Sequence, residues 1–342
     1  CFQISCQGAT SITTFAVFLC DKVGPALREA VYERTSLVIA RDVKGKIPDF
    51  SGNKSTLEVC ILRYLAQEEN FGKFKQYLDN PRKFLETYIE TRVEKYCLGE
   101  NRRLEKFFDD SLTHLYESIQ SAVFASTNVV KDRSDRNDKI SLWLDEFCNA
   151  LGEVLNLPRR DLKGLEHQEI TDIEFLNNAM AEALAPLKDG LKKELASADM
   201  TSFVRKPHII LAEQFSGCWE RCPFCGGVCT NTMTNHDGEH LLFYHRPKAL
   251  TGWKWYGTDH LVIDICTSSV ASTYKTYRDA GPPYSTWNIP PDTSTQKYWK
   301  WFVCRFSTEL EQLYKRKFQG RGEIPDSWRI VTKQAALDEL TK

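Results

Sequence analysis

The sequence predicts a mainly α-helical fold: a multi-helix N-terminal region, residues 1–205, followed by a small α+β module, residues 206–342. Apolar residues recur at helical spacing through most of the first region. Near Phe203–Pro207 this period breaks off, and prolines, glycines and aromatic residues become frequent. Cysteines and histidines gather shortly afterwards. A hydrophobic content of 42% and a charged content of 27% are ordinary for a globular protein, so the chain can bury a core without disulfides.

Successive amphipathic helices are predicted in the N-terminal region. Ser55-Thr-Leu-Glu58 matches a capping box and predicts one helix start. Asn80-Pro81 predicts another, because asparagine caps helices and proline suits the first helical position. Apolar stripes continue over residues 104–123 and 140–155, and again after Thr171, where Pro186 is expected to kink or split the helix. The simplest role of these stripes is helix–helix core.

The module after residue 205 has a weaker pattern. Leu261–Ile265 suggests a short strand or a buried segment. Residues 281–291 contain two Pro-Pro pairs and cannot be helical. A long aromatic helix is then predicted from Tyr298 to Tyr314, and Thr332 is expected to cap a last helix that ends near Leu340.

The most informative segment is Cys222-Pro-Phe-Cys225-Gly, followed by His240 and His245. Two thiolates separated by two residues can bind one metal, and the following glycine permits a tight turn. The complete spacing, C-x2-C-x14-H-x4-H, is close to that of structural Cys2His2 zinc sites. We therefore predict Zn²⁺ bound by Cys222, Cys225, His240 and His245, with a structural role because four protein ligands close the site.

Other assignments of this segment remain open. Cys229 or His236 could replace a histidine of the predicted set, whereas Cys218 is assigned to core packing. His236-Asp-Gly-Glu-His240 matches an inverted zinc-protease motif, but Asp237-Gly238 favours a turn where that chemistry needs a helix. Cys222 and Cys225 could also form a redox dithiol, although the nearby histidines favour metal.

A nucleic-acid-binding zinc module is the main alternative function. Arg246, Lys248 and Lys254 could contact phosphates, and Trp253 and Trp255 could stack on bases. The net charge of −1 gives no strong basic field, so nucleic acid is not the expected partner.

Several classes are excluded or disfavoured by the sequence. No run of apolar residues is long enough to span a membrane, and no signal peptide is recognisable. Neither Gly45-Lys46 nor Gly52-Asn-Lys-Ser55 completes a phosphate-binding loop. No Ser/His/Asp set is evident, so no catalytic residue is assigned. Cysteines scattered along so long a chain favour a reducing compartment.

The sequence resembles the C-terminal region of the interferon-induced very large GTPase / up-regulator of cell proliferation family. The resemblance covers most of the chain and is weaker over residues 1–140. It rests on these segments: Trp143–Cys148, Gln168–Leu176, Ser216–Cys225, His236–His240, His245–Pro247, Tyr284–Trp287, Tyr298–Phe302 and Ile324–Trp328.

The resemblance implies a giant, interferon-inducible GTPase of innate immunity whose GTP-binding domain is absent from this chain. GTP is therefore a cofactor of the missing domain only. We expect a non-catalytic region for self-assembly or protein partners, in the cytoplasm or, as an alternative, also in the nucleus. A zinc hydrolase is the weaker alternative to the nucleic-acid module.

Overall fold

The computed structural model describes residues 2–99, 102–131, 139–152, 154–165, 172–242, 245–267, 277–290 and 296–340. The chain forms two compact units, each built from two separate segments. The first unit combines residues 1–43 with 92–210, and the second combines residues 44–91 with 211–342. The expected boundary at residue 205 lies near the point where the chain passes from the first unit to the second after residue 210. Residues 44–91 also belong to the second unit, which their sequence did not indicate.

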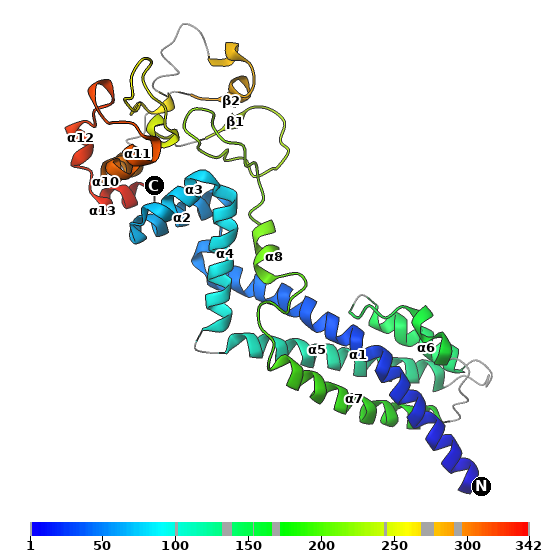
Figure 1. Ribbon diagram of the computed structural model, residues 1–342. Coiled ribbons are helices and arrows are strands. Elements are labelled where there is room, and N and C mark those ends of the chain that lie inside the picture. The colour runs from blue at the N-terminus through cyan, green and yellow to red at the C-terminus, as the bar shows by residue number, and fades with distance from the viewer. Residues whose placement is uncertain are drawn as a thin grey trace. The chain divides into compact units, whose positions relative to one another are not determined.

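In the part that the structure describes, the first unit contains helices and no strand (Figure 1). Helix α5 lies beside α6 and α7. Apolar side chains at helical spacing are buried along α5, from Leu104 to Val130, as the sequence pattern predicts. Phe15 of α1 contacts Trp143 of α6 edge to face, with ring centroids 6.1 Å apart. The helices of this unit are α1 Phe2–Lys46, α5 Arg103–Lys131, α6 Lys139–Leu151 and α7 Ile173–Leu195, with α4 Pro81–Leu98 and α8 Pro207–Glu213 shared with the second unit.

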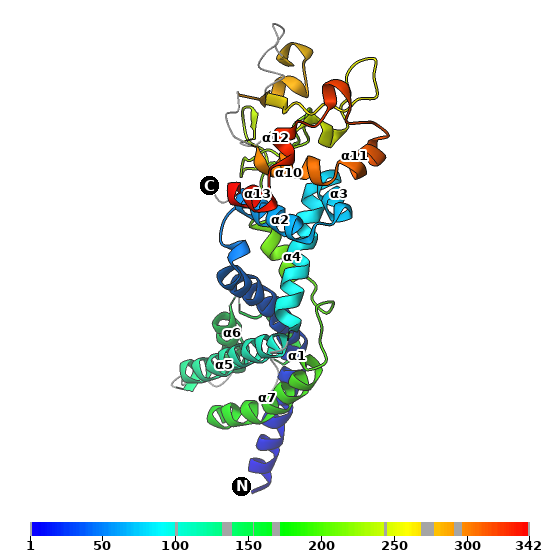
Figure 2. The same cartoon turned by 90° about the vertical axis from the view of Figure 1, so that its left-hand side faces the viewer.

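Short elements make up the second unit. Helices α2, α10 and α13 pack together, as Figure 2 shows. Its α-helices are α2 Lys54–Glu68, α3 Phe71–Asp79, α10 Lys297–Arg305, α11 Ser307–Tyr314, α12 Asp326–Arg329 and α13 Lys333–Glu339. Two strands, β1 His240–Leu241 and β2 Trp287–Asn288, pair in parallel, with His240 opposite Trp287.

An aromatic core joins the two segments of the second unit. The Phe74 ring of α3 lies 4.6 Å from that of Phe302 and 5.3 Å from that of Phe306. The buried Tyr298 hydroxyl donates a hydrogen bond to the Leu62 carbonyl of α2, at 2.7 Å. Aromatic pairs contribute about 0.5–1.5 kcal/mol each beyond the burial of their area. These contacts bring α2 and α3 into the C-terminal module.

The mainly α fold class is confirmed, and so is the helix start at Asn80-Pro81. Helix α4 begins at Pro81, and Asn80 Oδ1 accepts a hydrogen bond from the Lys83 amide at 3.0 Å. The other predicted cap is wrong, because Asn53 rather than Ser55 caps α2, through bonds from the amides of Ser55 and Thr56. Its side chain offers an acceptor two residues earlier than the predicted capping box does.

Three further predictions are corrected. Pro186 does not split α7, which continues from Ile173 to Leu195. The segment Leu261–Ile265 forms only isolated bridges, at Leu261 with Lys254 and at Ile265 with Pro247. The long aromatic helix is divided into α10 and α11 at Phe306, whose φ and ψ of −118° and 26° leave the helical region.

Candidate metal centres

The cysteine- and histidine-rich segment begins with a hairpin formed by residues 218–231. The amide of Cys218 bonds to the Asn231 carbonyl at 3.0 Å, and that of Cys229 bonds to the Glu220 carbonyl at 2.9 Å. At the tip, the amide of Cys222 bonds to the Gly227 carbonyl at 2.8 Å. Cys222 therefore lies at the turn of the hairpin, whereas Cys218 and Cys229 lie on its two arms.

Glycine is required at the turn itself. Gly226 has φ +68°, in the left-handed region that favours glycine. Its amide bonds to the Cys222 carbonyl at 2.9 Å, which closes the loop around the Cys222 and Cys225 thiols. A Cβ on Gly227 would lie 2.2 Å from Cδ2 of Leu242. This is the knuckle geometry that the sequence predicts for Cys222-Pro-Phe-Cys225-Gly.

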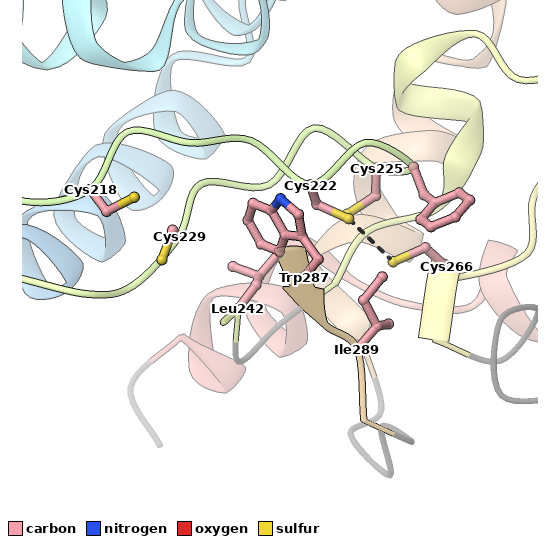
Figure 3. Close-up of a cluster of buried hydrophobic side chains, with 9 residues drawn as sticks. Cys218, Cys222, Cys225, Cys229, Leu242, Cys266, Trp287 and Ile289 are labelled. Atoms are coloured by element: carbon pink, nitrogen blue, oxygen red, sulfur yellow. Dashed lines mark hydrogen bonds between the residues drawn. The ribbon is translucent and has the colours of Figure 1, made fainter. Parts of the chain in front are cut away.

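Four buried residues gather at the hairpin tip: Cys222, Cys225, His245 and Cys266, here called the Cys3His group. Their donor atoms all lie within 4.8 Å of one another. The Cys222 and Cys266 sulfurs are 4.0 Å apart (Figure 3). His245 Nδ1 lies 3.5 Å from the Cys225 sulfur and 2.7 Å from that of Cys266.

A second set lies at the open end of the hairpin: Cys218, Cys229, His236 and His240, here called the Cys2His2 group. Cys218 Sγ lies 3.4 Å from His240 Nδ1, and Cys229 Sγ lies 3.7 Å from His236 Nε2. His236 Nε2 and His240 Nδ1 are 3.2 Å apart. The two cysteines are buried, and the two histidines are half-buried.

The separations within both groups fit a tetrahedral zinc ion. Zn–S and Zn–N bonds of about 2.3 and 2.05 Å place two sulfurs about 3.8 Å apart, a sulfur and a nitrogen about 3.5 Å apart, and two nitrogens about 3.3 Å apart. Five of the six separations given above lie within about 0.3 Å of these values, the exception being the shorter one between Cys266 and His245. A Cys222–Cys266 disulfide would require about 2.05 Å, so these thiols are free.

Charge in the Cys3His group concentrates on one sulfur. Burial alone would raise the pKa of Cys225, but hydrogen bonds from Cys222, Cys266 and His245 outweigh it and hold the pKa well below its ordinary value. The hydrogen bond to Cys225 raises the pKa of Cys222 to about 12, and burial raises that of Cys266. A bound cation would supply the positive charge that lets all three thiols ionise.

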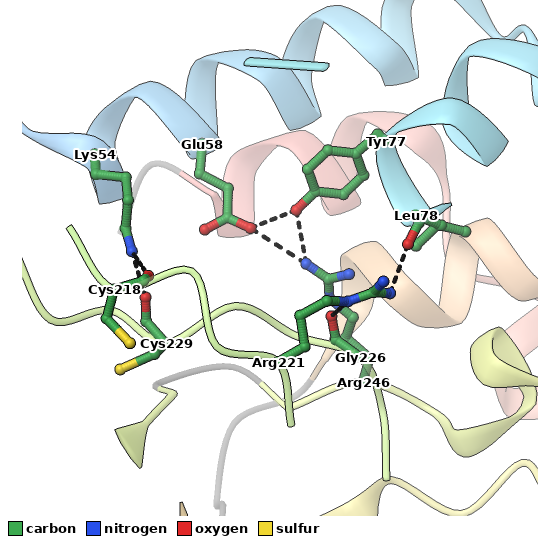
Figure 4. A network of polar contacts seen from close by, with 9 residues as sticks. All are labelled: Lys54, Glu58, Tyr77, Leu78, Cys218, Arg221, Gly226, Cys229 and Arg246. Carbon is green, nitrogen blue, oxygen red and sulfur yellow. Dashed lines mark hydrogen bonds and ion pairs between the residues drawn. The ribbon is translucent and has the colours of Figure 1, made fainter. Parts of the chain in front are cut away.

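Buried cations attach both groups to α2 and α3 (Figure 4). Lys54 donates to the carbonyls of Cys218 and Cys229, the latter at 2.6 Å. Arg246, which follows His245, donates to Glu58 at 3.2 Å and to the Tyr77 hydroxyl at 2.6 Å. Other hydrogen bonds link Arg221 with the carbonyls of Leu78 and Asp79.

The predicted ligand set, Cys222, Cys225, His240 and His245, is divided between the two groups. Cys222, Cys225 and His245 lie together, but His240 belongs to the other group, and Cys266 takes the fourth position. Cys218, assigned to core packing, is buried in an apolar cluster and is also part of the Cys2His2 group. The position of Cys266 directly after the largely apolar segment Leu261–Ile265 was the available sequence signal for it.

The alternative chemistries find little support in the geometry. Glu239 pairs with Arg278, and residues 236–239 are not helical, so the protease arrangement is absent from this segment.

The nucleic-acid alternative also finds little support. Arg246 is only 2% exposed and is engaged by Glu58 and Tyr77, which removes it from any phosphate-binding surface. Lys248 is half-buried, with its ammonium over the rings of Phe224 and Trp253. Of the three proposed phosphate contacts, only Lys254 is exposed.

Comparison with known proteins gives the family context. Residues 218–340, which carry both groups, match the model of the C-terminal domain of interferon-induced very large GTPase 1. The chain matches the C-terminal region of the interferon-induced very large GTPase family. Interferon-induced very large GTPase 1 of Mus musculus is 43% identical over 354 aligned residues, and that of Homo sapiens is 44% identical. Both alignments include the whole of this chain.

The chain spans 14% of the length of these very large GTPases. No solved structure matches it. Among the described helices, none is both long and apolar enough to cross a bilayer.

Proposed function

We infer that this chain is a non-catalytic, zinc-stabilised interaction region of a very large, interferon-inducible GTPase of innate immunity. The observation that carries the inference is the buried Cys3His group, whose four protein donors would complete the coordination of zinc and leave no position for a substrate. GTP binding and hydrolysis then belong to other parts of the protein. The resemblance to the GTPase family along the whole chain supports this division.

Zinc is the metal that fits best. Three thiolates and an imidazole are soft and borderline ligands, which suit zinc and disfavour magnesium or calcium. The buried group joins the hairpin tip, His245 and Cys266, which the chain order separates. Because such a site cannot exist in the unfolded chain, its metal-binding free energy contributes directly to folding.

An aromatic loop is the best candidate for the contact surface. Tyr256 is fully exposed and Trp253 is 37% exposed. The loop is nevertheless ordered by backbone bonds of 2.9 Å from Trp255 to His260 and from Val262 to Trp253. Aromatic side chains on a rigid loop lose little entropy on binding and are enriched among interface residues that dominate affinity. We propose that this loop contacts a protein partner or a second copy of the chain.

Replacing Trp253 and Tyr256 by alanine tests this role. The double variant should lose self-association in light scattering, or partner capture in pull-down, by at least about 30-fold, since truncation of a single hot-spot residue costs about 2 kcal/mol. Phe124→Ala is the control, because Phe124 is 59% exposed on α5, outside the loop. Unchanged association of the double variant would refute the surface. GTP binding by the chain itself, lost on substituting one of its residues, would refute the non-catalytic assignment.

A further inference from the structure

The Cys2His2 group is more than a set of polar side chains beside the Cys3His group. Its donor atoms all lie within 4.8 Å of one another and belong to residues that the Cys3His group does not use. We propose that Cys218, Cys229, His236 and His240 form a second, independent zinc site. The proposal rests on the proposed function only in that both sites would stabilise the same module.

Three parts of the backbone carry the residues of the Cys2His2 group: the hairpin arms, strand β1 and the loop between them. Cys218 and Cys229 face each other across the hairpin arms. His240 lies in β1, where it pairs with Trp287 of β2, and the two rings are 5.2 Å apart. His236 lies on the loop between the hairpin and β1. A metal bound here would therefore tie that loop and the two-stranded sheet to the base of the hairpin.

Net charge favours a divalent metal at this position. Two thiolates and two neutral imidazoles carry a charge of about −2, which Zn²⁺ balances.

Lys54 is a positioning residue for this site. Its ammonium donates to the carbonyls of Cys218 and Cys229 and lies 5.0 Å from the Trp219 ring. One buried cation therefore holds both ligand-bearing arms from the side of α2.

The two sites should differ in how readily they exchange metal. All four residues of the Cys3His group are buried, whereas His236 and His240 are half-buried. A chelator can therefore reach the second site without unfolding of the hairpin tip. We expect the metal of the Cys2His2 group to leave first and that of the Cys3His group to leave more slowly.

Metal content measured by mass spectrometry tests the second site. The unchelated chain should contain two zinc ions, and Cys229→Ser should contain one. Cys304→Ser should retain two because Cys304 belongs to neither group. One zinc in the parent chain, with no change in Cys229→Ser, would overturn the second site and leave the Cys3His centre intact.

Cobalt substitution identifies which site remains. Cobalt bound to Cys229→Ser should show the thiolate charge-transfer absorption of three sulfurs. Should Cys229→Ser fail to fold, His236→Asn removes a half-buried ligand and should also lower the zinc content to one. Identical cobalt spectra in His236→Asn and the parent chain would contradict the assignment.

Discussion

At the scale of single residues, Arg246 connects the ligand-bearing segment with the helices. Its guanidinium bonds to Glu58 and Tyr77 and lies 4.4 Å from the Trp299 ring. Burial alone would lower the pKa of Arg246, but Tyr77, Glu58 and Cys225 outweigh this effect and raise it. The guanidinium therefore stays charged, and it fixes the backbone next to His245.

Arg246→Ala should lower the free energy of unfolding by about 3–5 kcal/mol, because removing one partner of a buried ion pair leaves the other uncompensated. Chemical denaturation of the metal-loaded chain measures this loss. Lys254→Ala, at an exposed position in the neighbouring loop, should change stability by less than about 0.5 kcal/mol. Equal stabilities of the two variants would show that the buried network does not support the module.

The candidate site shows what sequence spacing can and cannot predict. Cys222 and Cys225 share one turn, so their proximity is a local property that C-x2-C spacing indicates. The choice between His240 and Cys266 as their partner is not local. It depends on the pairing of the Cys266 amide with the Arg246 carbonyl, at 3.3 Å, which brings distant residues together. The spacing therefore predicts a single site from residues that the fold divides between two groups.

At the scale of elements, the sequence predicted the helices better than the connections. A buried stripe such as that of α5 repeats over several turns, so its period is clear from the residues alone. The strands β1 and β2 contain two residues each, which is too short for any period, and their pairing joins distant parts of the chain. Helix ends were less certain because neighbouring polar residues, such as Asn53 and Ser55, compete for the cap.

Loss of the Cys3His metal should unfold the elements of the second unit. Structural zinc contributes about 10–16 kcal/mol in zinc-finger peptides, comparable with the total stability of a domain. Cys222→Ser should therefore increase amide hydrogen exchange in residues 44–91 and 211–340 and leave α5, α6 and α7 protected. Cys304→Ser serves as the control for replacing a cysteine. Protection of residues 211–340 in Cys222→Ser equal to that in the parent chain would contradict a structural role for the metal.

At the scale of the whole molecule, the main surprise is that each unit is built from two segments of the chain. Residues 44–91 are helical, like the sequence on either side of them, so their composition does not separate them from the first unit. Their assignment comes from specific long-range contacts, such as Phe74 with Phe302 and Lys54 with the hairpin. Contacts between residues more than 150 positions apart leave no periodic signal in the sequence.

The order of the ligands along the chain has a mechanical consequence for the module. The two groups alternate: Cys218 is followed by Cys222 and Cys225, then by Cys229, His236 and His240, and finally by His245 and Cys266. Residues 232–235, between Cys229 and His236, are exposed and open to a protease. A cut there would leave ligands of both metals on each side of the break.

Coordination bonds would then join two fragments that no longer share a peptide bond. After limited proteolysis in this stretch, the fragments should elute together in moderate denaturant while metal is bound, and should separate once a chelator is added. Separation at the same denaturant concentration with and without metal would contradict this expectation. A chain folded around two interleaved metals can therefore be severed at its surface without falling apart.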